Sequence, residues 1–389
     1  MFIKADEYSE DPLLLSKRAP ELTAKIPIIT WQMVFIIFLS LVIIAGDIWY
    51  PWCIAKTFIA FCTIFYLLST VYKFILMRYA ISHQAEIQIS EEELNRLKND
   101  DLPDYSILVP MYHEAESVAD IVIAIKQLDY PEDKLDVQLV LEEDDMETLN
   151  AVNQTKLPAN IRVTLVPPSL PRTKPKACNV ALARARGKYL VIYDAEDRPE
   201  PDQLRKAVAA FRRLPSNIIC LQSKLNYYNP RQNLLSRWFT IEYSTWFDLF
   251  LPGLSKCGGM IPLGGTSNHF VTDKLKELMG WDAYNVTEDC DLGVRIYRAG
   301  YKSRMLNTTT WEEACCVLPY WIRQRTRWLK GYIQTYLVHM RHPLRFIKDV
   351  GIINFLHFHA LIAGVVFACL INPLYWILAL TWFCFRVEA

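Results

Sequence analysis

Two uncharged, apolar regions enclose the polar middle of this 389-residue chain, and they limit its fold more than any other feature. At the N-terminal side, one apolar run spans Pro27 to Gly46 and another spans Thr57 to Tyr72. The C-terminal run spans Val350 to Phe385. About 20 apolar residues are enough for a helix to cross the ~30 Å hydrocarbon core of a bilayer. The sequence therefore predicts a polar domain inserted between transmembrane helices.

Basic residues around the first two runs predict their orientation. Lys17, Arg18 and Lys25 precede the first run, and Lys73 and Arg78 follow the second. Because cytoplasmic flanks are enriched in Lys and Arg, the N-terminus and the polar domain are expected in the cytoplasm. The first run is too long, and lies too far into the chain, for a cleaved signal peptide.

The C-terminal run contains Asn372-Pro373, which we interpret as a tight turn between one crossing and a second, shorter one. A re-entrant hairpin is the alternative. The expected organisation is a cytosolic N-terminal segment (1–25), two transmembrane helices (26–78), a cytosolic domain (100–317), an interface helix (318–349) and one or two further transmembrane helices (350–389).

Charge and cysteine content exclude other classes. Lys plus Arg and Asp plus Glu number 42 each, so no net field favours nucleic acid. The ten cysteines include no Cys-x-x-Cys pair, and we expect reduced thiols in a cytosolic compartment.

The polar middle alternates short apolar segments with amphipathic ones, as α/β domains do. Strands are expected at 105–110, 137–141, 163–166 and 189–193, with helices at 115–128 and 176–186. This alternation predicts a mostly parallel sheet, which binds ligands at the carboxyl ends of its strands. Acidic clusters follow two of the predicted strands at such ends.

One of these clusters is Asp194-Ala195-Glu196-Asp197, which is followed by Pro199 and Pro201 and is therefore expected on a turn. Hard carboxylate oxygens on a turn suit Mg²⁺ or Mn²⁺, whose coordination shell a diphosphate can complete. The alternative is a solvated acidic turn that caps the helix expected from Asp202.

Two further short motifs lie at predicted helix starts. The basic stretch Arg172 to Lys176 precedes a helix expected near Ala177, and ammonium groups beside a helix N-terminus favour phosphate. Thr287-Glu288-Asp289 opens a helix that ends at Gly300, where the helix dipole keeps an Asp ionised and able to accept a proton. The alternatives are a basic surface loop and simple helix capping.

The segment 320–337 has apolar residues on one side and basic or polar residues on the other, which predicts a helix at a membrane interface. The aromatic segment 233–251 favours the same interpretation. Arginines on such helices could instead serve only anionic lipid.

Together these motifs resemble family 2 glycosyltransferases of the cellulose synthase, chitin synthase and hyaluronan synthase type. The resemblance covers roughly residues 100–340. Its six motifs, in order, are Val109 to Glu114, Glu142-Glu143, Lys174 with Lys176, Asp194 with Glu196, Thr287-Glu288-Asp289, and Gln324-x-x-Arg327-Trp328.

The resemblance implies a GT-A fold and inverting transfer of a sugar from a nucleotide diphosphate sugar, most often UDP-linked, to a growing polysaccharide. It implies Mg²⁺ or Mn²⁺ held by Asp194 and Glu196 with Asp197 close by, and Asp289 as general base beside Glu288. The implied substrate contacts are Tyr112, Glu114, Glu142 and Glu143 at the nucleotide, Lys174 and Lys176 at the diphosphate, Thr266, Ser267 and Asn268 facing the acceptor, and Gln324, Arg327 and Trp328 over both.

Two departures from the family pattern are visible. Glu142-Glu143 replaces the usual Asp-Asp, and Asp-x-Glu-Asp stands where Asp-x-Asp is common. The expected spans are fewer than long-polymer synthases use, so a homo-oligomer or an export partner is expected if the product is long. The alternatives are a single-sugar transferase acting on a lipid acceptor, of the ceramide or polyprenyl phosphate type, and a non-catalytic scaffold that retains the fold.

Overall fold

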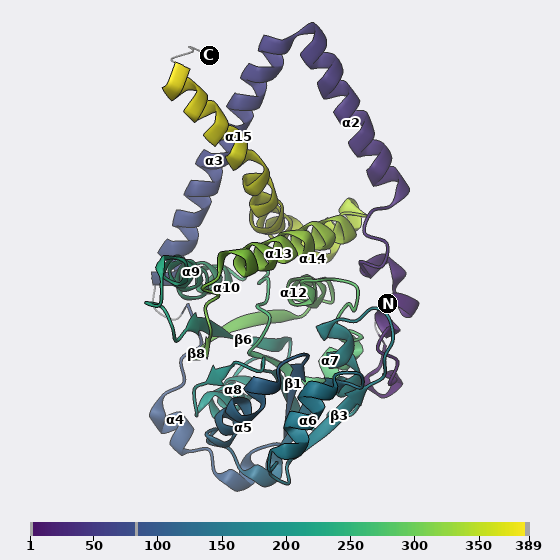
Figure 1. The fold of residues 1–389 in the computed structure, drawn as a ribbon, viewed down its shortest axis with the longest axis vertical. Coiled ribbons are helices and arrows are strands. Elements are labelled where there is room, and N and C mark those ends of the chain that lie inside the picture. The colour runs from purple at the N-terminus through teal and green to yellow at the C-terminus, as the bar shows by residue number, and fades with distance from the viewer. Residues whose placement is uncertain (1–2, 82–84, 386–389) are drawn as a thin grey trace.

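The central domain is built on a mixed eight-stranded sheet, in a computed structural model that describes residues 3–81 and 85–385 (Figure 1). The strand order is β3-β2-β1-β4-β7-β6-β8-β5. Strands β1, β2, β3 and β4 are parallel, β7 is antiparallel to both β4 and β6, and β8 is parallel to β6. The strands are β1 (Tyr105–Met111), β2 (Leu135–Glu142), β3 (Ile161–Val166), β4 (Tyr189–Ile192), β5 (Arg198–Pro199), β6 (Ile218–Tyr227), β7 (Asn268–Val271) and β8 (Lys302–Glu312).

Helices cover both faces of this sheet. Side chains alternate between the two faces along each strand, so both faces carry apolar side chains that the helices bury. Ile107 of β1 packs in one core with α5 and α8, whereas its neighbour Leu108 packs in the other core with α7 and α12. The helices and helical turns of the domain are α4 (Glu91–Asn95), η3 (Asn99–Asp101), η4 (Ala115–Ser117), α5 (Val118–Lys126), η5 (Glu132–Lys134), α6 (Met146–Gln154), α7 (Lys174–Ala183), α8 (Gln203–Arg213), α9 (Leu234–Ser244), η6 (Thr245–Phe250), α10 (Leu251–Lys256), α11 (Thr272–Glu277) and α12 (Glu288–Arg298). The predicted α/β alternation is confirmed.

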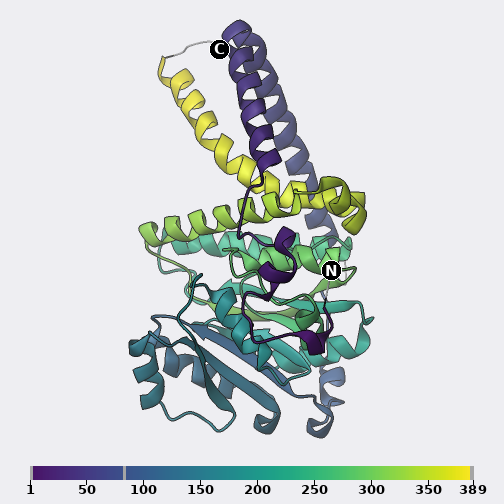
Figure 2. The same ribbon diagram turned by 90° about the vertical axis from the view of Figure 1, so that its right-hand side faces the viewer.

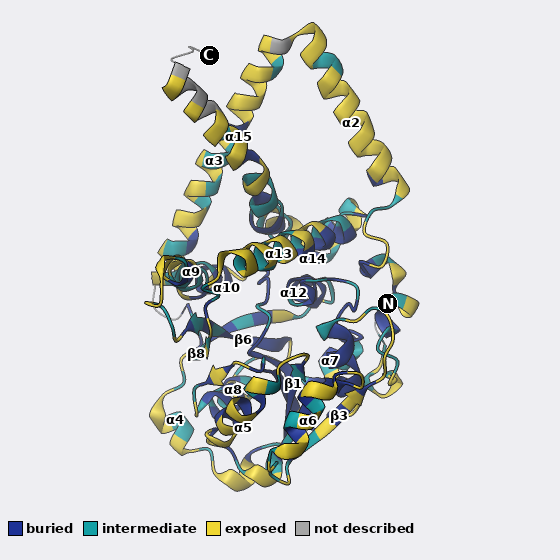
Figure 3. Cartoon of the chain, in the orientation of Figure 1, coloured by how far each residue is buried: buried dark blue, intermediate teal, exposed yellow. Residues whose placement is uncertain are grey.

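Long apolar helices extend from one side of the domain. They are α2 (Thr30–Trp49), α3 (Pro51–Ile81) and α15 (Gly364–Phe385), and α2 and α3 form a hairpin that points away from the sheet (Figures 1 and 2). Helix α14 (Pro343–Phe358), which precedes α15, lies against the domain and contacts α12. Within the described ranges, three helical segments are long and apolar enough to cross a membrane: Thr30–Trp49, Trp52–Ile81 and Pro343–Ile377. Most of their side chains are exposed (Figure 3).

The C-terminal run differs from the prediction. No turn forms at Asn372-Pro373, because α15 continues through Pro373 and Asn372 accepts a hydrogen bond from the Tyr66 hydroxyl on α3. Neighbouring helices often compensate a proline in an apolar helix in this way. The chain changes direction earlier, at the π-helical turn η7 (His359–Ala363). The interface segment 318–349 is likewise two helices, α13 (Leu318–His339) and the first part of α14.

The N-terminal segment is bound to the domain before α2 begins. It contains η1 (Ala5–Glu7), α1 (Leu14–Arg18) and η2 (Pro20–Leu22). The Thr23 hydroxyl donates to buried Asp282 (2.7 Å), and Arg341 donates to the carbonyls of Pro20 and Thr23 (both 3.0 Å). On α2 itself, the Gln32 amide donates to the Leu337 carbonyl of α13 (2.8 Å). The start of α2 is therefore fixed against the end of α13.

Candidate active site

The sheet directs its functional residues to one edge. Strands β1, β2, β4, β6 and β8 run in the same direction, so their carboxyl ends share that edge, and the antiparallel β7 begins there. Helix α13 crosses the molecule on the side of the apolar helices and contacts α12 (Figure 1). The candidate site lies between this edge, the N-terminus of α12 and α13.

The acidic turn after β4 is held by its own last carboxylate. Asp197 is buried, and its Oδ2 accepts from the Asp194 amide (2.8 Å) and from the Thr266 hydroxyl. Among the described residues, its Oδ1 has no hydrogen-bond partner. The Lys174 ammonium donates to Asp194 Oδ1 and to the Gly265 carbonyl (2.8 Å). One lysine therefore ties the acidic turn to the loop before β7.

The carboxylates of this cluster repel one another. Partial loss of hydration, followed by Asp194, raises the pKa of Glu114 and of Glu196 to about 7 each. Burial and then Asp194 raise the pKa of Asp197 well above its usual range, and burial and then Asp197 do the same for Glu312. A divalent cation would relieve this repulsion.

A metal ion fits the chemistry of this donor set. The unpartnered Oδ1 of Asp197 and the hard oxygens of Asp194 and Glu196 suit Mg²⁺ or Mn²⁺. Across residues 3–81 and 85–385, no three such side chains are already gathered in ligating geometry.

The carboxylates at the start of α12 lie opposite the acidic turn. A Cβ placed on Gly265 would lie 3.5 Å from Asp289 Oδ2, and Asp289 Oδ1 accepts from the Cys290 amide (2.7 Å). Burial raises the pKa of Asp289, with Lys174 and Arg327 acting in the opposite direction. Burial and then Asp289 raise the pKa of Glu288 to about 7. A half-buried carboxylate of raised pKa between two cations can accept a proton near neutral pH.

Lys174 stays charged in this environment. Burial alone would lower its pKa, but Asp194 and then Glu288 raise it above the ordinary lysine value. The ammonium group therefore places a positive charge beside the acidic turn.

Asp145, a buried carboxylate that is not among the predicted site residues, supports the turn after β1. Asp145 is the N-cap of α6, and it accepts from the His113 amide (2.7 Å) and the Thr148 amide (3.2 Å). The backbone of His113 has a positive φ of 57°, which few residues other than glycine adopt without such support. Asp145 thus holds the turn that presents Tyr112 and Glu114. The available signal was an Asp that can serve as a helix N-cap, but no helix was predicted at 146–154.

The family of the chain is shown by comparison with protein-family profiles. Residues 189–387 match the profile of Glycosyl transferase family group 2, and residues 106–264 match that of Glycosyl transferase family 2. The chain belongs to glycosyl transferase family group 2. It is 28% identical over 234 residues to a probable glycosyltransferase of Bacillus subtilis (strain 168), YdaM, an alignment that spans 59% of this chain and 56% of that relative. The aligned region thus spans little more than half of the relative's length.

The fold of this glycosyltransferase is of the GT-A type. It superimposes on a mannosyltransferase from Pyrobaculum calidifontis, solved in complex with GDP-Man and Mn²⁺, with a TM-score of 0.55 and 20% identity over 83% of this chain and 91% of that one. The prediction of a GT-A domain and of a glycosyltransferase is confirmed.

Seven predicted site residues of the glycosyltransferase lie near one another around Lys174, because their charges act on one another: Glu114, Lys174, Asp194, Glu196, Glu288, Asp289 and Arg327. Lys176, Glu142 and the loop 266–268 are placed differently. Lys176 is fully buried, and its ammonium donates to the carbonyls of Pro167 (3.2 Å) and Ser169 (3.0 Å) and to Glu142 (3.3 Å). It is therefore not placed to contact a diphosphate, and Glu142 is its partner. Glu143 is exposed next to Glu142.

The loop predicted to face the acceptor is also buried. Thr266 supports Asp197, the Ser267 hydroxyl donates to the Thr310 hydroxyl (2.6 Å), and the Asn268 amide donates to the Gly264 carbonyl (2.5 Å). These side chains support the loop, and the backbone of Gly265 faces the site in their place.

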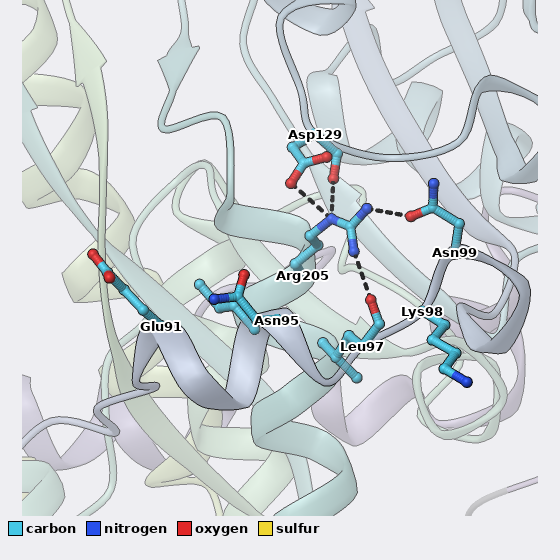
Figure 4. Close-up of a pocket in the computed structure, with 8 residues that line it drawn as sticks. Glu91, Asn95, Leu97, Lys98, Asn99, Asp129 and Arg205 are labelled. Carbon is cyan, nitrogen blue, oxygen red and sulfur yellow. Dashed lines mark hydrogen bonds and ion pairs between the residues drawn. The ribbon is translucent and has the colours of Figure 1, made fainter.

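A surface pocket elsewhere does not belong to this site. It is lined by residues of α4 and the following segment together with Asp129 and Arg205 (Figure 4). Arg205 is fully engaged there by Asp129 (2.8 Å), the Leu97 carbonyl (3.1 Å) and Asn99 (2.5 Å). These contacts fasten α4 to α8.

The glycosyltransferase should bind Mn²⁺ more tightly as pH rises from 6 to 8. Glu114 and Glu196, whose pKa values are raised to about 7, carry protons at pH 6 that the metal must displace. Between the ordinary Glu pKa and 7 the metal-free folded state binds more protons than the unfolded state, so its stability falls as pH rises. Mn²⁺ should therefore raise the melting temperature more at pH 8 than at pH 6. Equal shifts at the two pH values would contradict this assignment.

Helix α13 lies so close to α12 that only glycine fits between them. A Cβ on Gly331 would lie 2.3 Å from the Thr287 hydroxyl oxygen. Gly331→Ala should therefore push α13 away from Thr287-Glu288-Asp289, lowering the free energy of unfolding by about 1–3 kcal/mol. The initial rate of sugar transfer should fall together with the stability.

The matched control for Gly331→Ala is Gly364→Ala, at another helical glycine, where the nearest atom lies 3.5 Å from the new Cβ. Melting temperature and initial rate should change in the first variant only. A Gly331→Ala protein with wild-type values of both would show that this contact is dispensable.

Proposed function

We propose that the chain is an inverting glycosyltransferase that moves a sugar from a nucleotide diphosphate sugar to an acceptor hydroxyl at a membrane surface. One observation carries the proposal: Lys174 and Gly265 connect the acidic turn to Asp289, so a candidate cation site and a candidate base face the same space. Inverting transfer needs this pair, with the base on the acceptor side and positive charge on the leaving diphosphate.

Each residue then has a role. Asp289 takes the proton from the acceptor hydroxyl as the oxygen attacks the anomeric carbon. Glu288, the preceding residue, is the second carboxylate at this position. Lys174 and Arg327 carry positive charge toward the diphosphate as the bond to the sugar breaks. Tyr112, Glu114 and Glu143 border the nucleotide, and Gln324 and Trp328 close over the acceptor end.

Asp194, Glu196 and Asp197 would hold Mg²⁺ or Mn²⁺, which supplies charge neutralisation to the diphosphate. The mannosyltransferase of the same fold was solved with GDP-Man and Mn²⁺, which supports a metal and a nucleotide sugar in this site. The donor nucleotide is UDP or GDP.

The membrane placement rests on the apolar helices. We propose that α2, α3 and α15 cross the bilayer, with the catalytic domain in the cytoplasm and α9, α13 and the start of α14 at the interface. Helices α9 and α13 lie on the side of the domain from which the spans emerge (Figure 1), and they carry exposed apolar or aromatic residues: Trp238 and Ile241 on α9, and Tyr320 and Ile322 on α13. Aromatic and aliphatic side chains at this level fit lipid headgroups.

The proposed acceptor is a growing polysaccharide, as in the cellulose, chitin and hyaluronan synthase type, with a second copy or an export partner if the polymer is long. A single-sugar transferase to a lipid acceptor is the second candidate. It is favoured by Trp238 and Ile241, which expose apolar surface on the same helix whose Phe239 packs against Trp328.

The test is radiolabelled sugar incorporation by purified membranes, with a panel of UDP- and GDP-sugars and with Mn²⁺, Mg²⁺ or EDTA. Metal-dependent incorporation from one donor would establish the transferase, and product size would distinguish polymer from glycolipid. Absence of turnover with every donor would favour a non-catalytic scaffold.

A further inference from the structure

A charged contact joins α13 to α9, and neither of its two residues has a role in the proposed function. Arg325 forms a bidentate ion pair with Glu242 of α9, with Nη1 and Nη2 each 2.5 Å from a carboxylate oxygen. Two parallel hydrogen bonds of this kind fix the orientation of a guanidinium group as well as its position. Lysine cannot reproduce that geometry.

The same guanidinium lies within an aromatic box. Its carbon is 4.5 Å from the ring centre of Phe239, 4.7 Å from that of Trp328 and 5.1 Å from that of Trp321. Cations attract the faces of aromatic rings, most strongly where water is excluded. Arg325 is mostly buried, with 23% of its side chain exposed. Arg325 therefore contacts the Trp328 ring, which also packs against Phe239 and Tyr243.

We propose that the Arg325–Glu242 pair is a latch that positions Trp328 over the acceptor end of the site. Arg325 and Glu242 are positioning residues, since they act through Trp328 and not on the substrate. The proposal rests on the proposed function, because it assigns Trp328 to the acceptor. The donor side, formed by the acidic turn and Lys174, lies outside the latch.

Opening the latch should therefore lower transfer without weakening nucleotide binding. In Arg325→Lys and in Glu242→Gln, incorporation into the endogenous membrane acceptor should fall by about 10-fold, as expected for the loss of one buried cation–π and ion-pair contact. The affinity for mant-UDP or mant-GDP with Mn²⁺ should match wild type. The double variant should incorporate as much sugar as the less active of the two single variants, because both changes break the same contact.

Arg323→Lys is the matched control, since Arg323 lies on the same helix and is exposed, with its guanidinium 5.8 Å from the ring of Tyr320. It should behave as wild type. Glu242 is half-exposed, so Glu242→Gln should fold normally, which the melting temperature checks.

The latch is overturned if Arg325→Lys transfers sugar as well as Arg323→Lys does, or if nucleotide affinity falls in step with transfer. A wild-type protein that binds nucleotide but transfers no sugar would overturn the proposed function, and the latch with it.

Discussion

Asp289→Asn should lower kcat by about 10²- to 10⁴-fold, the usual contribution of a general base. The amide keeps the size of the side chain and can still accept from the Cys290 amide, but it cannot take a proton from the acceptor. Affinity for nucleotide should hold, because the acidic turn and Lys174 are unchanged. Initial rates of sugar incorporation, with nucleotide binding measured in parallel, check both expectations.

The control for this change is Asp273→Asn. Asp273 is also in the first turn of a helix, α11, but it is exposed and follows the end of β7, opposite the edge at which β7 begins. Loss of kcat in both variants would point to a general effect of charge. Retained kcat in Asp289→Asn would require another base, and Glu288 would be the nearest candidate.

Asp194→Ala should lower kcat/KM by at least about 100-fold, since a metal contributes several kcal/mol to stabilising the charge of the transition state. The substitution also removes the acceptor that holds the Lys174 ammonium against the acidic turn. Mn²⁺ titration in the presence of nucleotide should show a higher dissociation constant, and excess Mn²⁺ should restore part of the activity.

Asp133→Ala, at an exposed carboxylate in η5, is the control and should leave metal binding unchanged. If Asp194→Ala binds Mn²⁺ as wild type does, the acidic turn is not the metal site. The raised pKa values around Asp194 would then reflect crowding alone.

Local signals predicted the frame of the site. Strand β4, the acidic turn after it and the start of α12 each carry their own pattern of alternation, turn residues or capping, so a short window of sequence is enough to locate them. The position of the acidic turn at the edge where β1, β2 and β4 end also follows from the rule that parallel strands end together, whereas the position of the start of α12 does not.

The support of the site depends on contacts between distant residues, which local patterns do not contain. Thr266 reaches Asp197 across 69 positions and Ser267 reaches Thr310 across 43. From sequence alone, these hydroxyls were indistinguishable from residues that face a substrate. They are buried because β7 lies between β4 and β6, a pairing that the local sequence does not indicate.

Lys174 and Lys176 show how a small error in a helix boundary changes a role. The helix was expected near Ala177 but begins at Lys174, so both lysines lie in its first turn. Residues two apart on a helix face different sides. One lysine accordingly reaches Asp194, and the other is directed into the protein toward Glu142.

The bonds that fix the start of α2 have a consequence for which acceptors can react. Gln32 attaches α2 to Leu337, and Arg341 attaches the preceding segment to the end of α13, the helix that packs on the start of α12. With α2 in a bilayer, as we propose, these bonds set the height of Asp289 relative to the lipid surface. The enzyme would then select an acceptor by the depth of its hydroxyl group in the membrane, in addition to any selection by the shape of a binding pocket.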